Sequence, residues 1–307
     1  MTLIYLDDQF AVHDTGNHPE CIERITRLNA AIRASEVLST ATFPVWQNAS
    51  QPQITSVHSP EYVQQLESWC AAGAGRIEAD TVVSQGSWLA AVRGAGAAID
   101  AVNRVVDEEA KRAFCAIRPP GHHALPGGPM GFCLLNNIAI AARSAIARGL
   151  RSVLIVDWDV HHGNGTQDAF YEDGQIGFYS IHRSPFYPGT GAKDETGSGR
   201  GLGWIYNEPV SADISKKQFL DCFQRGVEDL AGRVKPELIL LSAGFDAHQN
   251  DPVGGLCLEE QDYGDLTAWL IDVAENYCGG KLVSLLEGGY HLTHMPSSAL
   301  EHVEKLM

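Results

Sequence analysis

The amino-acid sequence predicts an α/β fold in which helices cover both faces of a central, mostly parallel sheet. Short apolar runs alternate with longer segments of helical periodicity, and the runs are apolar on both faces, as strands between two helical layers are. The alternation extends along the chain with no internal repeat, low-complexity tract or Pro/Ser-rich linker. We therefore expect one domain that spans residues 1–307.

Five strands and five helices follow from this pattern. The predicted strands are Arg112–Ile117, Ser152–Val156, Ile176–Ile181, Glu237–Leu241 and Lys281–Leu286. The predicted helices lie near Gly86–Val106, Asn136–Arg148, Lys216–Arg233, Glu259–Glu275 and Ser297–Lys305.

Chemically reactive side chains directly follow four of the predicted strands. In open α/β sheets, ligands bind beyond the carboxyl ends of the strands, so we expect the four segments to converge on one site. These segments are Arg118–His123, Asp157–His162, Ser242–Asp246 and Glu287–Tyr290.

Composition narrows the class of partner. The chain has 38 acidic and 22 basic residues and a formal net charge of −16, which repels phosphate backbones and anionic lipids. We expect no nucleic-acid or membrane partner, whereas lysine-rich segments or amines would suit the charge. Seven scattered cysteines without a CxxC pair, no signal peptide and no apolar run of membrane-spanning length predict a soluble, cytoplasmic protein.

The segment after the second predicted strand suits a metal ion. Asp159 and His161 are two residues apart in an extended segment, so their side chains point the same way. Asp246, at the end of another strand, could supply a third ligand. Two carboxylates and one imidazole leave positions open for water and substrate, as a catalytic zinc site requires. Taken alone, the segment fits equally well a strand end that enters a polar loop.

Two further segments carry candidate acid–base groups. His122 and His123 follow a rigid Pro-Pro-Gly turn and suit a proton-transfer pair, although alone they would be ordinary loop histidines. Tyr290 follows two glycines and could donate a hydrogen bond to a developing oxyanion, or simply pack in a turn. The chain has no P-loop, GxGxxG helix start, GxSxG or HExxH motif, which argues against nucleotide binding, serine hydrolysis and zincin chemistry.

At these residues the chain resembles the histone deacetylase superfamily, the zinc-dependent acyl-amide hydrolases with an arginase-like three-layer α/β/α fold. The matching segments occur in family order over nearly the whole chain. Asn164, where the class I pattern has Asp, resembles class II and its bacterial relatives. The segments are His18–Glu20 with Arg24, Arg118–His123, Gly131–Asn137, Asp157–Gln167, Pro188–Gly191, Ser242–His248, Asp251–Leu256 and Leu286–Tyr290.

The resemblance implies catalytic roles. Asp159, His161 and Asp246 would bind one Zn²⁺, and Tyr290 would donate to the oxyanion. His123 would carry the proton from water to the leaving amine.

The resemblance also implies which groups orient the two histidines. Asn164 would orient His123, and Asp157 would orient His122, which would assist electrostatically. A neutral Asn raises imidazole basicity less than Asp would, so His123 would be neutral more readily near pH 7.

Two further sets come from the same resemblance. Gly131, Phe132 and Tyr187 match positions that line a narrow channel for the acyl-lysine stem. The family also binds K⁺ beside the zinc, and the residues that match this inner site are Asp157, Asp159, His161, Ser180 and Ile181.

We therefore expect a zinc-dependent hydrolase that removes acetyl or a related short acyl group from an N-acyl-lysine protein or peptide, or from a small acylated amine. The alternative within the superfamily is an acetylpolyamine amidohydrolase. Val253 stands where one polyamine-specific branch has a glutamate, which favours acyl-lysine, while the negative charge favours cationic substrates of either kind. A silent acyl-lysine-binding module is disfavoured because all the reactive groups are present, and a dimanganese ureohydrolase needs more carboxylates.

Overall fold

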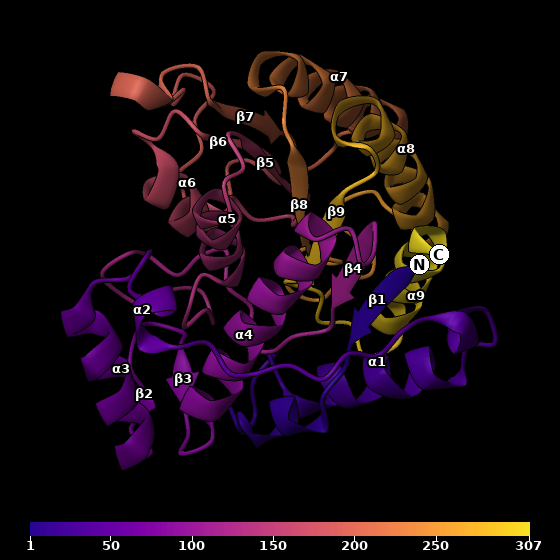
Figure 1. Ribbon diagram of the computed structural model, residues 1–307. Helices are drawn as coiled ribbons and strands as arrows, with labels where there is room; N and C mark the ends of the chain where they lie inside the picture. Colours follow the sequence, from indigo (N-terminus) through magenta and orange to yellow (C-terminus); the bar gives the residue numbers. More distant parts are fainter.

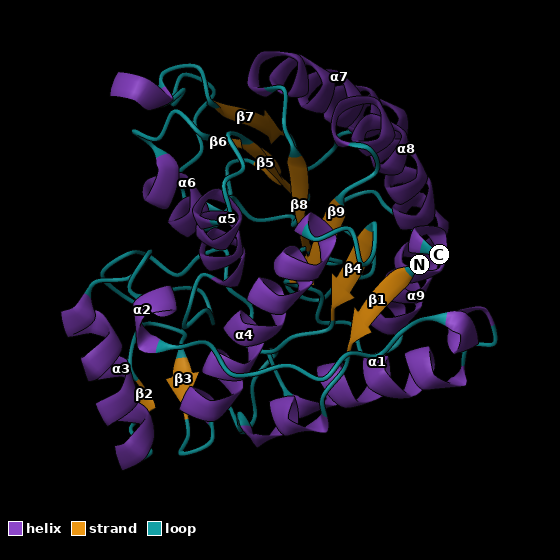
Figure 2. Cartoon of the chain, viewed as in Figure 1, coloured by secondary structure: helices purple, strands orange, loops and turns teal.

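The computed structural model describes residues 1–307 and is built around a seven-stranded sheet in the order β1-β4-β9-β8-β5-β6-β7 (Figures 1 and 2). All neighbouring strands of this sheet run parallel, as the sequence predicts. The strands are β1 (Thr2–Tyr5), β4 (Arg112–Cys115), β5 (Val153–Asp157), β6 (Ile176–Arg183), β7 (Ile205–Val210), β8 (Leu238–Ala243) and β9 (Leu282–Leu286). A separate antiparallel pair joins β2 (Gly75–Arg76) to β3 (Val82–Val83).

Helices cover both faces of the sheet and form the two outer layers (Figure 2). One layer contains α4 (Ser87–Val106), α5 (Asn137–Ala147) and α6 (Asn164–Phe170), and the other contains α1 (Ile22–Ala34), α7 (Lys216–Val234), α8 (Glu260–Cys278) and α9 (His294–Leu306). The α/β/α fold class is therefore confirmed. The remaining helical segments are α2 (Gln51–Ile54), α3 (Pro60–Ala72) and three short 3-10 turns at Asp8–Val12, Val37–Thr40 and Gly199–Gly201.

All five predicted strands and all five predicted helices are present, with ends that differ by a few residues. The two edge strands, β1 and β7, were not predicted. β7 carries Asn207, Glu208 and Pro209, so it lacks the continuous apolar run by which the central strands are recognised. An edge strand pairs on one side only, where such polar residues and a proline are tolerated.

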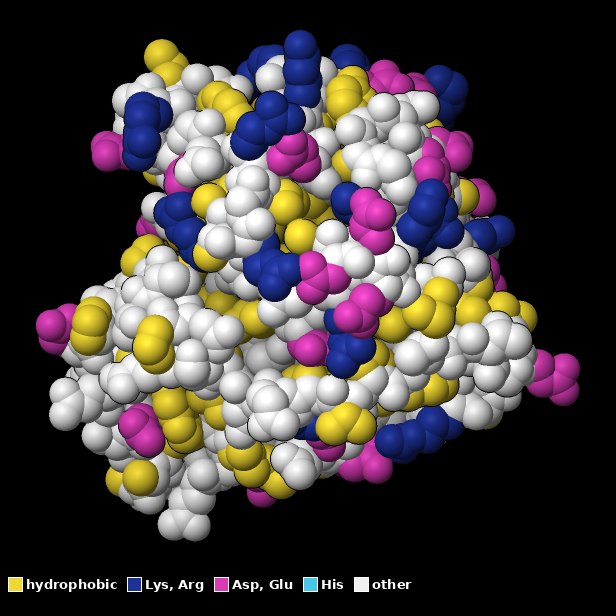
Figure 3. Space-filling view, viewed as in Figure 1, with side chains coloured by type: hydrophobic (Ala, Val, Ile, Leu, Met, Phe, Trp, Pro, Cys, Tyr) yellow, Lys and Arg dark blue, Asp and Glu magenta, His cyan; other side chains and the backbone are white.

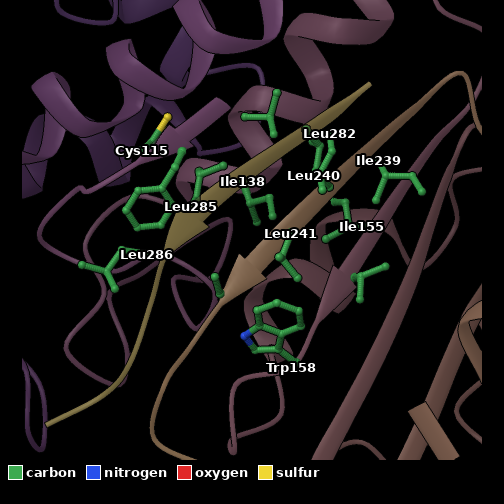
Figure 4. Packing of buried hydrophobic residues seen from close by; sticks show 14 of the residues in the cluster. Cys115, Ile138, Ile155, Trp158, Ile239, Leu240, Leu241, Leu282, Leu285 and Leu286 are labelled. Atoms are coloured by element: carbon green, nitrogen blue, oxygen red, sulfur yellow. The ribbon is translucent and has the colours of Figure 1, made fainter. Parts of the chain in front are cut away.

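The core lies on both faces of the central strands. Every residue of β5, β8 and β9 is buried, and Figure 4 shows Leu241, Ile155 and Leu285 among the side chains packed there. Trp158, directly after β5, is fully buried, with its ring 5.4 Å from that of His302 on α9 and perpendicular to it. Burial of each large apolar side chain contributes about 1.5–3 kcal/mol, so this packing fixes the strand ends that carry the site.

The chain ends lie side by side beside α9 (Figure 1), where the Thr2 hydroxyl donates a hydrogen bond to the carbonyl of Leu306 at 2.6 Å. On the face shown in Figure 3, acidic and basic side chains are interspersed and no histidine is visible. None of the helices combines the length and the apolar character needed to cross a lipid bilayer.

Candidate active site

The four segments that the sequence places after strands all begin at the carboxyl ends of adjacent strands. β4, β9, β8 and β5 are neighbours in the sheet, so the segments that follow them start side by side. Cys115 pairs with Leu285, and Ser242 pairs with both Leu285 and Asp157, which sets the four ends level. The sheet order therefore brings the four segments together at one site, as the sequence predicts.

Asp159, His161 and Asp246 form a buried cluster at these strand ends. His161 Nδ1 lies 3.0 Å from Asp159 Oδ1 and 3.2 Å from Asp246 Oδ2, and the three ligand atoms lie within 4.8 Å of one another. Backbone N–H groups orient both carboxylates, because Gly288 donates to Asp159 Oδ2 and Val160 donates to Asp246 Oδ1. Asp246 Oδ2 is buried and accepts no hydrogen bond, so it remains available to an ion.

Two glycines make room for the carboxylates. A Cβ at Gly244 would lie 2.1 Å from Asp159 Oδ2, and a Cβ at Gly288 would lie 2.2 Å from Asp246 Oδ2. Any other residue at either position would push a carboxylate away from the cluster. The glycines of the SAGFD and EGGY segments thus serve the packing of the metal-binding groups.

The cluster has the charge of a cation site. Burial and the nearby Asp159 carboxylate raise the pKa of Asp246 to about 7. Burial alone would lower the pKa of His161, but its contacts with Asp159 and Asp246 outweigh burial and raise it to about 10. Two buried carboxylates and an imidazole therefore hold a positive charge between them, and a Zn²⁺ fits both this charge and the N/O donor set.

His122 and His123, which are adjacent in the sequence, each contact a different side chain that orients the ring. His122 Nδ1 lies 2.9 Å from Asp157 Oδ2, and His123 Nδ1 lies 2.7 Å from Asn164 Oδ1. Their ring centres are 4.0 Å apart. Asn164, the first residue of α6, thus reaches His123, while Asp157, the last residue of β5, reaches His122.

The two histidines differ in basicity. Burial lowers the pKa of His123 well below its usual value, and the neighbouring His122 and His161 lower it further. Burial also opposes the charged form of His122, but the carboxylates of Asp159 and Asp157 outweigh it and raise the pKa of His122 well above the usual value. His123 is therefore the ring suited to accept a proton as a neutral base.

A narrow pocket of about 220 Å³ opens over the cluster. His123 and His161 lie in its wall beside aromatic rings, with Tyr187 perpendicular to His123 at 5.3 Å and Phe186 stacked on His161 at 5.2 Å. The lining residues are Asp80, His123, Gly131, Phe132, His161, Phe186, Tyr187, Val253 and Tyr290. All four residues that the sequence assigns to substrate contact are among them.

Gly131 and Phe132 form a strained part of this wall. Both have positive φ, 54° for Gly131 and 69° for Phe132, and a Cβ at Gly131 would lie 2.5 Å from His123 Cδ2. The Phe132 N–H donates to the Thr81 hydroxyl at 3.1 Å, and its ring meets Tyr290 edge-on at 5.7 Å. The tight turn thus places the Phe132 ring in the pocket wall, in contact with Tyr290.

Tyr290 lies in the pocket wall with its phenol available as a donor. It is 8% exposed, and burial raises its pKa well above the usual value, so the hydroxyl stays protonated. The Arg24 guanidinium lies over its ring, 4.9 Å from the centre. This places an uncharged O–H donor at the pocket, as oxyanion stabilisation requires.

Several functional residues were not found from the sequence. Phe186 and Asp80 line the pocket, and Phe186 could have been suggested by its place beside Tyr187. Asp251 accepts backbone hydrogen bonds from Tyr290 at 2.7 Å and from Val253 at 2.9 Å, so one carboxylate ties the Tyr290 loop to the Val253 loop.

The matched segments His18–Glu20 and Arg118–His123 are joined by a buried ion cluster. Glu20 Oε1 lies 3.0 Å from Arg24 Nη1 and 2.6 Å from Arg118 Nε. Arg24 in turn donates to the carbonyls of Gly289 and Glu287, each at 2.6 Å. Glu20 and the two arginines thus connect these segments to the Glu287–Tyr290 segment of the site.

The residues of the predicted potassium set lie on β5, on the segment after it and on β6. Asp157 pairs with Ser180 across β5 and β6, and Ile181 follows in β6. The Ser180 hydroxyl is within 3.0 Å of His182 Nδ1, and Asp157 Oδ2 is engaged with His122. These contacts leave the potassium site a prediction.

Comparison with known proteins identifies the family to which a chain with this geometry belongs. Residues 18–306 match the family model of the histone deacetylase domain. The chain belongs to the histone deacetylase family. It is 36% identical to a probable deacetylase of Archaeoglobus fulgidus, over 94% of this chain and 81% of the relative. It is 35% identical to a histone deacetylase-like amidohydrolase of Pseudomonas aeruginosa, over 95% of this chain and 77% of the relative.

A solved structure with a similar level of sequence identity to this chain has the same fold. The HDA15 HD domain superposes with a TM-score of 0.94 at 35% sequence identity, over 99% of this chain and 87% of that chain. The resemblance seen in the sequence is confirmed, and the chain is a hydrolase of the deacetylase and amidohydrolase type. Two plant relatives, from Oryza sativa and Arabidopsis thaliana, are named chloroplastic, and the cytoplasmic location of this chain stays a prediction.

Proposed function

We propose that the chain is a zinc-dependent deacylase that removes acetyl or a related short acyl group from N-acyl-lysine. One observation carries the proposal: Asp159, His161 and Asp246 converge beneath a narrow pocket whose walls include His123 and Tyr290. A hydrolase of amides needs a group that polarises the carbonyl, a base for water and a donor for the oxyanion. The pocket lining and the cluster beneath it offer all three functions.

Asp159, His161 and Asp246 would hold the zinc through two carboxylate oxygens and one imidazole nitrogen. When bound, Zn²⁺ polarises a carbonyl and acidifies a water molecule. Three protein ligands are the number that leaves a position open for substrate and water. The buried, unpaired Asp246 Oδ2 supports this assignment, because a buried carboxylate oxygen without a partner is costly.

His123 carries the proton in this mechanism. The hydrogen bond from its Nδ1–H to Asn164 leaves Nε2 as the lone-pair nitrogen, which takes the proton from water and later delivers it to the leaving amine. His122, held protonated by Asp157 and Asp159, contributes positive charge beside it. Tyr290 donates its O–H to the oxyanion that forms as water adds to the carbonyl.

The channel walls support an acyl-lysine substrate. Phe132, Tyr187 and Phe186 offer apolar faces to a methylene stem, and Val253 gives the rim an apolar side chain. Asp80 favours the second candidate, an acetylpolyamine, because its carboxylate lines the same pocket and could meet a distal ammonium. Burial and the adjacent Glu78 raise the pKa of Asp80, which weakens such an ion pair.

We also propose a structural K⁺ beside the zinc, held by Asp157, Asp159, His161, Ser180 and Ile181. The pairing of β5 with β6 supports it, since this register sets Asp157 level with Ser180. The thermal unfolding temperature, measured at increasing KCl concentration, tests this proposal. NaCl at equal ionic strength is the control.

The substrate class is tested by steady-state kinetics. Acetyl-, propionyl-, butyryl- and trifluoroacetyl-lysine peptides are compared with acetylputrescine and acetylspermidine, each as kcat/KM. The proposal expects turnover of at least one acyl-lysine peptide that exceeds turnover of both polyamines. Preference for the polyamines over every peptide would replace it with the second candidate.

A further inference from the structure

A second cluster of possible metal ligands lies outside the active site. It consists of His248 in the segment after β8, Glu260 at the start of α8 and His294 at the start of α9. Glu260 bridges the two rings, with Oε1 2.5 Å from His294 Nδ1 and Oε2 3.3 Å from His248 Nε2. The rings stack face to face, 4.5 Å between centres, and one ligand atom from each residue falls within 4.8 Å of the others.

His248 supplies an independent observation. Its ring is 1% exposed, and its buried Nε2 has no hydrogen-bond partner although it faces the Glu260 carboxylate. Its Nδ1 accepts the Asn250 N–H at 3.1 Å, which fixes the orientation of the ring. Leaving a buried polar nitrogen without a partner is costly, and an ion bound between Nε2 and the carboxylate would satisfy it.

We propose that His248, Glu260 and His294 bind a second divalent transition-metal ion, with Zn²⁺ as the best match. Imidazole and carboxylate are ligands for Zn²⁺, Co²⁺ and Ni²⁺ rather than for Ca²⁺ or Mg²⁺, which prefer oxygen alone. Glu260 and His294 are about 30% exposed, so solvent reaches the cluster and water completes the coordination.

Metal binding here displaces protons. The proton between His294 Nδ1 and Glu260 is replaced by the metal ion. The His248 proton moves from Nε2 to Nδ1, which gives up the hydrogen bond from Asn250. Gln249 and Asn250 are exposed, so this peptide can turn towards solvent.

The site joins three segments next to the reaction centre. His248 follows the proposed zinc ligand Asp246 by two residues, and His294 follows Tyr290 by four. An ion bound by His248, Glu260 and His294 connects the beginnings of α8 and α9 to the segment after β8. We therefore assign it a structural role, which does not depend on the proposed catalytic function.

The experiment counts zinc in four proteins after equilibrium dialysis against Zn²⁺: the wild type, Asp246→Ala, Glu260→Gln and the double variant. The proposal expects two, one, one and no equivalents per chain. Glu259→Gln is the matched control, since Glu259 is adjacent but pairs with Lys216, and it keeps two equivalents. Equal zinc in wild type and Glu260→Gln overturns the second site. Equal zinc in wild type and Asp246→Ala instead contradicts the catalytic assignment alone.

A thermal measurement provides a second readout. In Asp246→Ala, added Zn²⁺ occupies only the second site and raises the unfolding temperature, because it binds the native state and cross-links three segments. The same addition leaves the double variant unchanged. A rise of equal size in the double variant would show that zinc acts elsewhere and would overturn the proposal.

Discussion

The side chains of His123 and Asn164 meet at 2.7 Å between Nδ1 and Oδ1, although 41 residues separate them in the sequence. His122 makes the corresponding contact to a carboxylate, that of Asp157. Two adjacent histidines thus differ in partner, one neutral and one charged. Burial lowers the pKa of His123, whereas the carboxylates of Asp159 and Asp157 outweigh burial and raise the pKa of His122, which supports our proposal that His123 transfers the proton.

Asn164→Asp should move the acidic limb of the kcat/KM profile to higher pH. In the wild type the lowered pKa of His123 keeps the base neutral, so activity persists below the usual histidine pKa of about 6.5. A carboxylate at Nδ1 favours the charged ring and shifts the limb up by about 1–3 pH units. The exposed Asn48→Asp serves as control. An unchanged limb would remove His123 as the titrating base.

Tyr290→Phe should lower kcat by about 10²–10³ while the zinc content and the unfolding temperature stay at wild-type values. The phenyl ring keeps its packing against Phe132 and Arg24, and only the O–H donor is lost. Tyr277→Phe, on the surface of α8, is the matched control. Wild-type kcat in Tyr290→Phe would exclude the hydroxyl from the mechanism.

Glu20→Ala should lower the free energy of unfolding by about 3–5 kcal/mol, because it leaves Arg24 and Arg118 buried without their counter-charge. Denaturant titration measures this, with the exposed Glu23→Ala as control. Arg118, His13 and Arg24 hold the pKa of Glu20 far below its usual value against the effect of burial. Its stabilisation is therefore present above about pH 4.3 and is lost as the pH falls further. A loss below 1 kcal/mol would contradict this role.

Val253→Glu should shift the kcat/KM ratio towards acetylspermidine by about tenfold, the equivalent of about 1.4 kcal/mol. Val253 lines the pocket, so a carboxylate there can pair with a distal ammonium. Val37→Glu introduces the same charge at an exposed site away from the pocket. If the ratio moves equally in both variants, net charge rather than position sets the preference.

Periodicity was sufficient to predict the central strands, because strands buried on both faces are apolar throughout. It missed the two edge strands: β7 carries polar residues and a proline, and β1, although buried, has only four residues. The chemistry of Asp159, His161 and Asp246 was visible as spacing and strand order. The partners of the two histidines came from the family resemblance, since nothing local indicates that Asn164 faces His123.

Other parts of the site have a role that no sequence pattern indicates; Asp251, for example, belongs to a matching segment to which the resemblance assigns no role. The Asp251 carboxylate holds two loops through backbone N–H groups, and such contacts depend on how the loops fold rather than on residue type. The cluster of His248, Glu260 and His294 spans 47 residues of sequence and becomes visible only when α8 and α9 pack together.

The central claim is that Asp159, His161 and Asp246 hold the catalytic metal, and zinc content measured together with turnover in Asp246→Ala tests it most directly. The account predicts one equivalent of zinc fewer per chain than in the wild type and no measurable hydrolysis of an acyl-lysine peptide, with the fold retained. Wild-type zinc content together with wild-type turnover in Asp246→Ala would contradict it.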